Sequence, residues 1–84
     1  MYFVYILKSQ KDLKLYTGFT PDTPYSRKTK HNSGDVPSTK GRRPLDLIYF
    51  EAYINERDAL RREKYLKTTA GKRAIKHMLR ETLS

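Results

Sequence analysis

The pattern of hydrophobic and polar positions predicts three strands. Residues 2–7 form a short apolar and aromatic run that is typical of a buried strand. In residues 13–19 apolar side chains recur at every second position, which predicts a strand with one buried face. The polar segment SQKD between these two runs favours a turn, so they are expected to form a hairpin. A third strand is predicted for residues 45–53.

Three helices are predicted around these strands. The first lies between Pro24 and Gly34, with Asp22 or Thr23 as its N-cap and Gly34 as its stop signal. Residues 35–44 are predicted to be a basic loop. The second helix covers residues 55–67 after an asparagine cap, and the third covers residues 70–83 with apolar residues at helical spacing. The order of elements is therefore ββαβαα.

The hairpin brings two tyrosines together. A turn centred between Gln10 and Lys11 places Tyr5 directly opposite Tyr16, so that both hydroxyls share one face of the sheet. A shift of one residue would move Tyr16 to the other face. Considered alone, the pair favours ordinary aromatic packing, and a shared functional site is the alternative.

The first predicted helix is polar on nearly every side, which leaves its purpose open. Arg27 and His31 are four residues apart and share one face. One interpretation is a solvated basic helix whose histidine lies near the C-terminus, where a cation is stabilised. The other is a helix that faces a ligand. Because His31 lies near a helix end, we expect His31→Ala to change stability little.

The second predicted helix carries a carboxylate in an apolar stripe. The stripe has three members: Ala59, Leu60 and Leu66. At about 100° per residue, Glu63 falls near the middle of it. A lone carboxylate among apolar neighbours is unstable unless it is paired or bound to a metal. The functional interpretation is a metal ligand or general base, and the alternative is a buried salt bridge to Arg27 or Arg43.

The net charge is the part of the composition that indicates a class of partner. The chain has 84 residues, with 18 Lys and Arg against nine Asp and Glu, a net charge of +9. This length predicts one domain over residues 1–84. The charge favours nucleic acid as a partner, and a solubilising surface is the alternative. The absence of cysteine excludes disulfides and cysteine-ligated zinc. With no membrane-spanning run and no signal-peptide pattern, we expect a cytoplasmic protein.

Several motifs in order resemble the GIY-YIG nucleases. FVY and, ten residues later, YTG resemble the paired motif that gives the family its name. HNSG, STKGRRP, LIYFE and ALRREKYLK follow in the same order, so the resemblance runs from residue 3 to about residue 67. The chain is most similar to small stand-alone bacterial members, which resemble the nuclease domain of a structure-specific DNA resolvase subunit. The resemblance implies an α+β fold, with a three-stranded, mostly antiparallel sheet flanked by helices.

The resemblance also implies a divalent-metal phosphodiesterase and assigns its residues. Tyr5 and Tyr16 match the motif tyrosines, Arg27 and His31 match the arginine and histidine of the first helix, and Glu63 matches the acidic metal ligand. We expect Glu63 to hold Mg²⁺ or Mn²⁺, Arg27 to clamp the phosphate, and Tyr5 to align or deprotonate water with help from His31. The hydroxyl of Tyr16 is expected to hold the geometry.

The sequence departs from the family pattern at two places, and its basic residues indicate where nucleic acid would bind. One extra residue precedes Arg27, and Ile75 stands near the place of an asparagine in larger members. The expected activity is structure-selective DNA cleavage, in repair or recombination. A catalytically weak module for branched DNA or structured RNA, or an RNA-associated protein, are the alternatives. Seven basic side chains are expected to contact the nucleic-acid backbone: Lys40, Arg42, Arg43, Arg61, Arg62, Lys64 and Lys67.

Overall fold

The computed structural model describes residues 1–84 and confirms the α+β fold. A sheet of three strands has the order β2-β1-β3, and both neighbouring pairs are antiparallel. The elements in chain order are β1 (Tyr2–Ser9), β2 (Leu15–Thr20), α1 (Pro24–Asn32), α2 (Pro37–Lys40), β3 (Leu45–Tyr53), α3 (Glu56–Leu66) and α4 (Thr69–Met78). No helix has the length and apolar character needed to cross a membrane.

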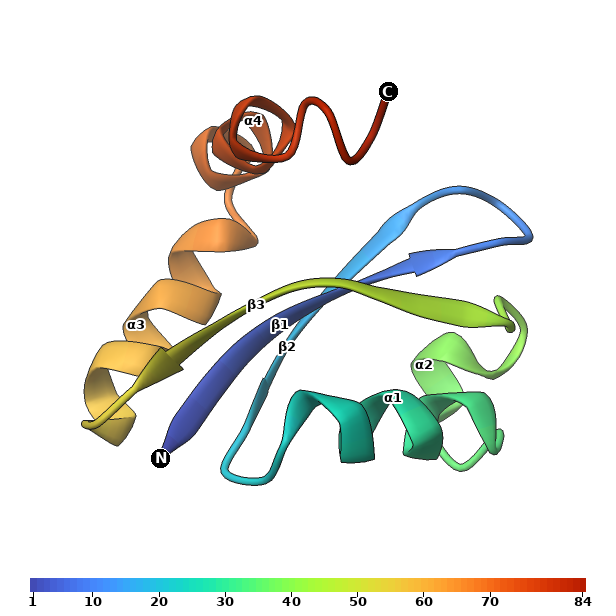
Figure 1. Cartoon of the computed structure of the whole chain (residues 1–84), viewed down its shortest axis with the longest axis horizontal. Helices are drawn as coiled ribbons and strands as arrows, with labels where there is room; N and C mark the ends of the chain where they lie inside the picture. Colours follow the sequence, from blue (N-terminus) through green and yellow to red (C-terminus); the bar gives the residue numbers. More distant parts are fainter.

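The two faces of the sheet are covered by different helices. Figure 1 shows α1 and α2 together on one side, and α3 and α4 on the other. Successive side chains of a strand point to opposite faces, so alternating residues of β1 pack into a hydrophobic core on each side of the sheet. Val4 and Ile6 pack with apolar residues of α3 and α4. Tyr5 and Leu7 lie on the other face, in the layer shared with α1.

The hairpin register differs from the prediction by two residues. Tyr5 lies opposite Gly18, and Leu7 lies opposite Tyr16. The predicted direct pairing of Tyr5 with Tyr16 is therefore wrong. A shift of two residues preserves the faces of a strand, however, whereas a shift of one would exchange them. The expectation that both tyrosines lie on one face is confirmed.

A wide turn causes this difference. The backbone N–H of Ser9 donates to the carbonyl of Lys14 at 3.0 Å, and the N–H of Leu13 donates to the carbonyl of Ser9 at 3.0 Å. Leu13 adopts φ 61° and is exposed. Leu13 and Lys14, which the alternating pattern assigned to the second strand, thus belong to the turn.

The helices follow their local signals with two exceptions. Thr23 caps α1 by accepting a hydrogen bond from the Ser26 N–H at 3.1 Å, and Gly34 follows its end with φ 87°. The predicted loop of residues 35–44 contains the short helix α2, which begins with proline at its first position. The last helix ends at Met78, before the predicted end at residue 83, and Leu83 packs against the core from beyond the helix.

An ion pair with two tyrosines joins β3 to α3. The Arg62 guanidinium donates from Nε and Nη2 to the two carboxylate oxygens of Glu51, at 2.9 Å each. The hydroxyls of Tyr49 and Tyr53 also donate to Glu51. Burial alone would raise the pKa of Glu51, but these hydrogen bonds, led by that of Arg62, lower it. Burial and the neighbouring carboxylate raise the pKa of both tyrosines to about 12.

Candidate active site

Three aromatic rings from three different elements meet on the α1 side of the sheet. Tyr5 of β1, Tyr16 of β2 and His31 of α1 have ring centroids 6.4 Å (Tyr5–Tyr16), 5.9 Å (Tyr5–His31) and 4.9 Å (Tyr16–His31) apart. The Tyr5 hydroxyl lies 2.9 Å from His31 Nε2. The structure therefore brings together three of the residues that the sequence singled out. Tyr16 contributes its ring, since its hydroxyl has no hydrogen-bond partner within the chain.

Gly18 makes room for Tyr5. A Cβ atom added to Gly18 would lie 2.4 Å from both Cζ and the hydroxyl oxygen of Tyr5. The tyrosine ring thus lies against its partner strand β2 at the one residue of that strand without a side chain. Sequence reasoning missed this role, although the glycine of the YTG motif was the signal for it.

We expect Gly18→Ala to destabilise the protein and to displace Tyr5. A methyl group in contact with a packed ring typically costs about 1–3 kcal/mol. For a domain of this size that loss lowers the melting temperature by about 4–8 °C per kcal/mol. Gly41→Ala is the matched control, because a Cβ at Gly41 meets no atom within 4 Å. Equal melting temperatures for the two variants would contradict the close approach of Tyr5 to Gly18.

His31 is fully buried between two hydroxyl groups. Its Nε2 faces Tyr5, and its Nδ1 lies 2.8 Å from the Thr39 hydroxyl of α2, which is also fully buried. The expectation that His31→Ala would change stability little is therefore wrong. That substitution would leave the buried Tyr5 hydroxyl without a partner, at about 1–3 kcal/mol, and would leave the Thr39 hydroxyl with only its bond to the carbonyl of Val36. Thr39 was missed because nothing in the loop sequence indicated that α2 would carry it under α1.

Arg27 lies one helical turn before His31, and its positive charge affects the pKa values of Tyr5 and His31. Its Nε is buried and has no hydrogen-bond partner. Burial raises the pKa of Tyr5, although the adjacent Arg27 guanidinium opposes this increase. Burial and the same positive charge lower the pKa of His31 below its usual value. At neutral pH the site thus holds a protonated tyrosine hydroxyl beside an uncharged imidazole.

We expect the buried histidine to make the fold sensitive to mild acid. Unfolded histidine titrates near about 6.5, and the folded pKa is lower. Between these two values the unfolded chain binds more protons, so His31 favours folding fully above pH of about 6.5 and this contribution is lost as the pH falls through that window. Urea unfolding between pH 5 and pH 8 measures the slope. His31→Ala should remove it, whereas a change of exposed His77 should not.

Glu63 lies on α3 in a different setting from the one predicted. Its carboxylate is 21% exposed and forms an ion pair with Lys67 at 3.2 Å. Leu60 is 42% exposed, so the apolar stripe around Glu63 is incomplete. The interpretation as a lone buried carboxylate is wrong, and neither Arg27 nor Arg43 is its partner. Burial is the main cause of the raised pKa of Tyr5, and the charge of Glu63 adds to it, but no hydrogen bond or ion pair joins Glu63 to Tyr5, Arg27 or His31.

The available ligands suit a metal ion that keeps most of its water. No three His, Cys, Asp or Glu side chains gather in a group that could enclose an ion. One Glu63 oxygen has no partner within the chain, since Lys67 contacts only Oε2. Magnesium ions commonly bind through one or two carboxylates, several waters and substrate phosphates. A single partly exposed carboxylate such as that of Glu63 fits this type of coordination.

Ile75 does not approach the site. It is 2% exposed and packs in the core formed by β1, α3 and α4.

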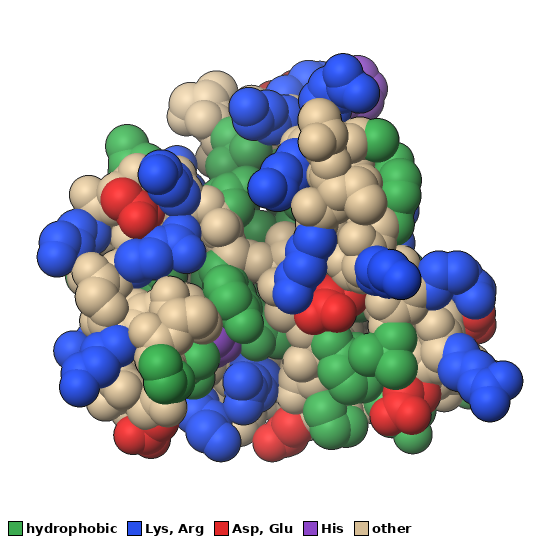
Figure 2. Space-filling view, turned by 180° about the vertical axis from the view of Figure 1, so that it is seen from behind, with side chains coloured by type: hydrophobic (Ala, Val, Ile, Leu, Met, Phe, Trp, Pro, Cys, Tyr) green, Lys and Arg blue, Asp and Glu red, His purple; other side chains and the backbone are tan.

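The seven basic residues expected to contact nucleic acid fall into two groups. Four have carboxylate partners within the chain: Arg42 with Asp12, Arg61 with Asp58, Arg62 with Glu51 and Lys67 with Glu63. Lys40, Arg43 and Lys64 are exposed and form no ion pair. Figure 2 shows Lys and Arg side chains around much of the rear face of the molecule, with acidic side chains at several places among them and hydrophobic side chains toward the middle.

Several known proteins are similar to this chain in sequence. The sequence model of the GIY-YIG catalytic domain matches residues 1–76. A UPF0213 protein of Clostridium perfringens is 45% identical over 67 residues, which is 80% of this chain and 71% of the relative. A UPF0213 protein of Staphylococcus epidermidis is 42% identical over 76 residues, 89% of this chain and 90% of the relative. No solved structure gives a significant match.

Proposed function

We propose that this chain, which belongs to the GIY-YIG catalytic-domain family, hydrolyses phosphodiester bonds in DNA with the help of a divalent metal ion. The observation that carries the proposal is the hydrogen bond of 2.9 Å between the Tyr5 hydroxyl and His31 Nε2, in a buried site beside Arg27. A buried hydroxyl with a basic nitrogen on one side and an unpartnered guanidinium on the other has the components of proton transfer next to a phosphate.

In this proposal the attacking water gives its proton to Tyr5. Because burial raises the pKa of Tyr5, its phenolate is scarcely populated at neutral pH. Tyr5 therefore passes its own proton to His31 Nε2 as it accepts one from water. This transfer requires an uncharged His31 whose proton sits on Nδ1 and is donated to Thr39. Thr39 is then a positioning residue for the imidazole.

The remaining groups act on the phosphate. Arg27 supplies charge-assisted hydrogen bonds to its oxygens, which hold the phosphate and stabilise the charge that develops on it. Glu63 would hold the divalent ion, which when bound supplies electrostatic stabilisation of the phosphate and the leaving oxygen. Tyr16 packs its ring against the His31 ring and helps to keep it in place.

Selectivity for the shape of DNA fits the chemistry of the surface. The exposed cations contact phosphates, and such contacts give affinity without reading base sequence. We therefore expect branched or partly single-stranded DNA to be cut in preference to uninterrupted duplex. This role would suit repair or recombination.

A nicking assay tests the proposed function. Labelled duplex, branched and single-stranded DNA are incubated with the protein in Mg²⁺, in Mn²⁺ and in EDTA. Cleavage that requires the ion and falls with rising salt is expected. Binding without cleavage in any of the three conditions would instead support the alternative, a nucleic-acid-binding module. That alternative is favoured by one observation, the presence of a single carboxylate at the candidate metal site.

A further inference from the structure

We propose a second phosphate-binding site, separate from the catalytic tyrosines, at the C-terminal end of α1. It lies in an open cavity of about 560 Å³. The lining residues are Lys11, Asn32, Lys40, Gly41, Arg43 and Pro44. The inference rests on the proposed function, since its ligand is a backbone phosphate of the nucleic-acid substrate. It adds Lys11, from the hairpin turn, to the residues that contact this substrate.

The charge of the cavity is uncompensated. Lys11, Lys40 and Arg43 are exposed, and none of them takes part in the four ion pairs of the chain. No carboxylate lines the cavity. Asp12, which follows Lys11 in the sequence, is bound to Arg42 instead. Three cations around one open space, with no acid among them, indicate an anion as the ligand.

The wall formed by Asn32 is fixed in place. Its side-chain amide donates to the carbonyl of Leu45 at 2.9 Å, and its carbonyl oxygen accepts from the Leu45 N–H at 2.8 Å. These two bonds join the end of α1 to the start of β3. Because both ends of the amide are bonded to Leu45, Asn32 is fixed in orientation and shapes the cavity. The cations supply the recognition of the ligand.

Arg43 is held in one position by its neighbours. Its Nε donates to the carbonyl of Lys40 at 2.8 Å. A Cβ atom at Gly34 would lie 2.6 Å from Arg43 Nη1, so the guanidinium rests against a glycine with φ 87°. The terminal nitrogens of Arg43 form no hydrogen bond within the chain. A guanidinium fixed through Nε, with its other donors free, is suited to bind the oxygens of a phosphate.

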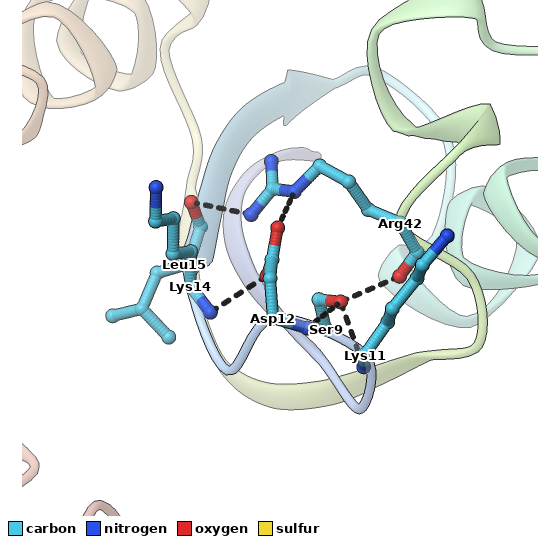
Figure 3. Close-up of polar contacts among 6 residues, drawn as sticks. All are labelled: Ser9, Lys11, Asp12, Lys14, Leu15 and Arg42. Carbon is cyan, nitrogen blue, oxygen red and sulfur yellow. Dashed lines mark hydrogen bonds and ion pairs between the residues drawn. The ribbon is translucent and has the colours of Figure 1, made fainter.

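Hydrogen bonds join the hairpin turn to the loop that contains Arg42, and they fix the position of the Lys11 backbone. Figure 3 shows Ser9 between the turn and the loop: its hydroxyl donates to the carbonyl of Arg42 at 2.6 Å and accepts from the N–H of Lys11 at 3.0 Å. The Arg42 guanidinium binds Asp12 and the carbonyl of Leu15. Arg42 thus braces the turn against the loop, and we assign the phosphate contact to Lys11, Lys40 and Arg43.

Two residues that line the cavity are sequence neighbours of residues in the candidate active site. Asn32 directly follows His31, and Lys40 directly follows Thr39. A strand whose scissile phosphate lies at Tyr5 and Arg27 could therefore place another phosphate in the cavity. The second contact would fix the direction of the strand without selecting its sequence.

Lys11→Ala and Lys14→Ala form a matched pair for the test. Both lysines are exposed residues of the hairpin turn, and both changes remove one positive charge, but only Lys11 lines the cavity. Binding of fluorescein-labelled branched DNA is measured by anisotropy in EDTA over a range of salt concentrations. Lys11→Ala and Arg43→Ala should each weaken binding about three- to tenfold and reduce the log–log salt slope by about 1.

The control and the outcomes distinguish this inference from the proposed function. Lys14→Ala should weaken binding less than about twofold, the small effect expected of a screened surface charge. Equal losses for Lys11→Ala and Lys14→Ala, or no loss for Lys11→Ala, would overturn the second phosphate site while leaving the proposed nuclease activity intact. Because the assay contains no metal, failure of the unmodified protein to cleave DNA does not affect it. Thermal melts verify that each variant is folded.

Discussion

Replacement of Glu63 by glutamine is expected to abolish DNA cleavage while leaving the fold and the metal-free DNA affinity intact. Glutamine keeps the size of the side chain and an oxygen atom, but it loses the charge that would hold a divalent ion. Electrostatic stabilisation by such an ion amounts to several kcal/mol, so the rate should fall by about 10²–10³-fold or more. Cleavage is measured over a wide range of Mg²⁺ concentrations, and binding is measured in EDTA.

Stability separates a metal ligand from a structural ion pair at this position. The pair of Glu63 with Lys67 joins residues four apart on α3, and the Lys67 side chain is 52% exposed. Such pairs contribute about 0.2–0.5 kcal/mol, so Glu63→Gln should change the melting temperature by only a few degrees. Glu56→Gln removes another carboxylate from the same helix and should leave cleavage unchanged. Retention of cleavage by Glu63→Gln within about tenfold of the unmodified protein would exclude Glu63 as the metal ligand.

Tyr5→Phe should slow cleavage by about 10²–10⁴-fold, the usual contribution of a general acid–base group. The ring keeps its packing over Gly18, and only the hydroxyl that faces His31 is lost. His31 Nε2 then has no partner in a buried site, which should cost about 1–3 kcal/mol of stability. Rates are therefore compared well below the melting temperature of the variant, at saturating DNA.

An exposed tyrosine provides the control for this change. Tyr25 is 63% exposed, so Tyr25→Phe removes a hydroxyl that is in contact with solvent and should leave the rate unchanged. Metal-free DNA binding should be unaltered in both variants. A loss of less than about tenfold for Tyr5→Phe would remove Tyr5 from the proton transfer and leave His31 as the group to test.

Those parts of the fold that depend on residues close together in the sequence could be predicted. The predicted bounds of β3 are confirmed, because most of its residues are apolar or aromatic and favour a strand. Asn55 caps α3 as expected, since an asparagine side chain can accept the N–H of a residue two positions later. The hairpin register could not be predicted in the same way. It depends on the turn around Leu13, which is held by the contact of Ser9 with distant Arg42.

In the candidate site, too, the features set by local geometry could be predicted, whereas those set by contacts between distant residues could not. The face shared by Arg27 and His31 follows from helix geometry, and the face shared by Tyr5 and Tyr16 follows from strand geometry. A helical wheel gives the direction of a side chain but not what packs against it. On α3 the polar Arg62 is half-buried, because Glu51 of β3 lies opposite it, whereas the apolar Leu60 is left exposed. The hydrogen bond from His31 to Thr39 required knowledge of α2, whose four residues carry almost no periodic signal.

The ion pair of Arg62 with Glu51 has a consequence for how ionic strength acts on catalysis. Arg62 precedes Glu63 on α3, so its two hydrogen bonds to β3 oppose rotation of the helix and hold Glu63 in one position relative to the sheet. Half-buried pairs are screened by salt much less than exposed contacts to phosphate. Rising salt should therefore release DNA well before it disturbs the orientation of Glu63. The loss of activity at high salt would then appear as an increase in KM, with kcat preserved.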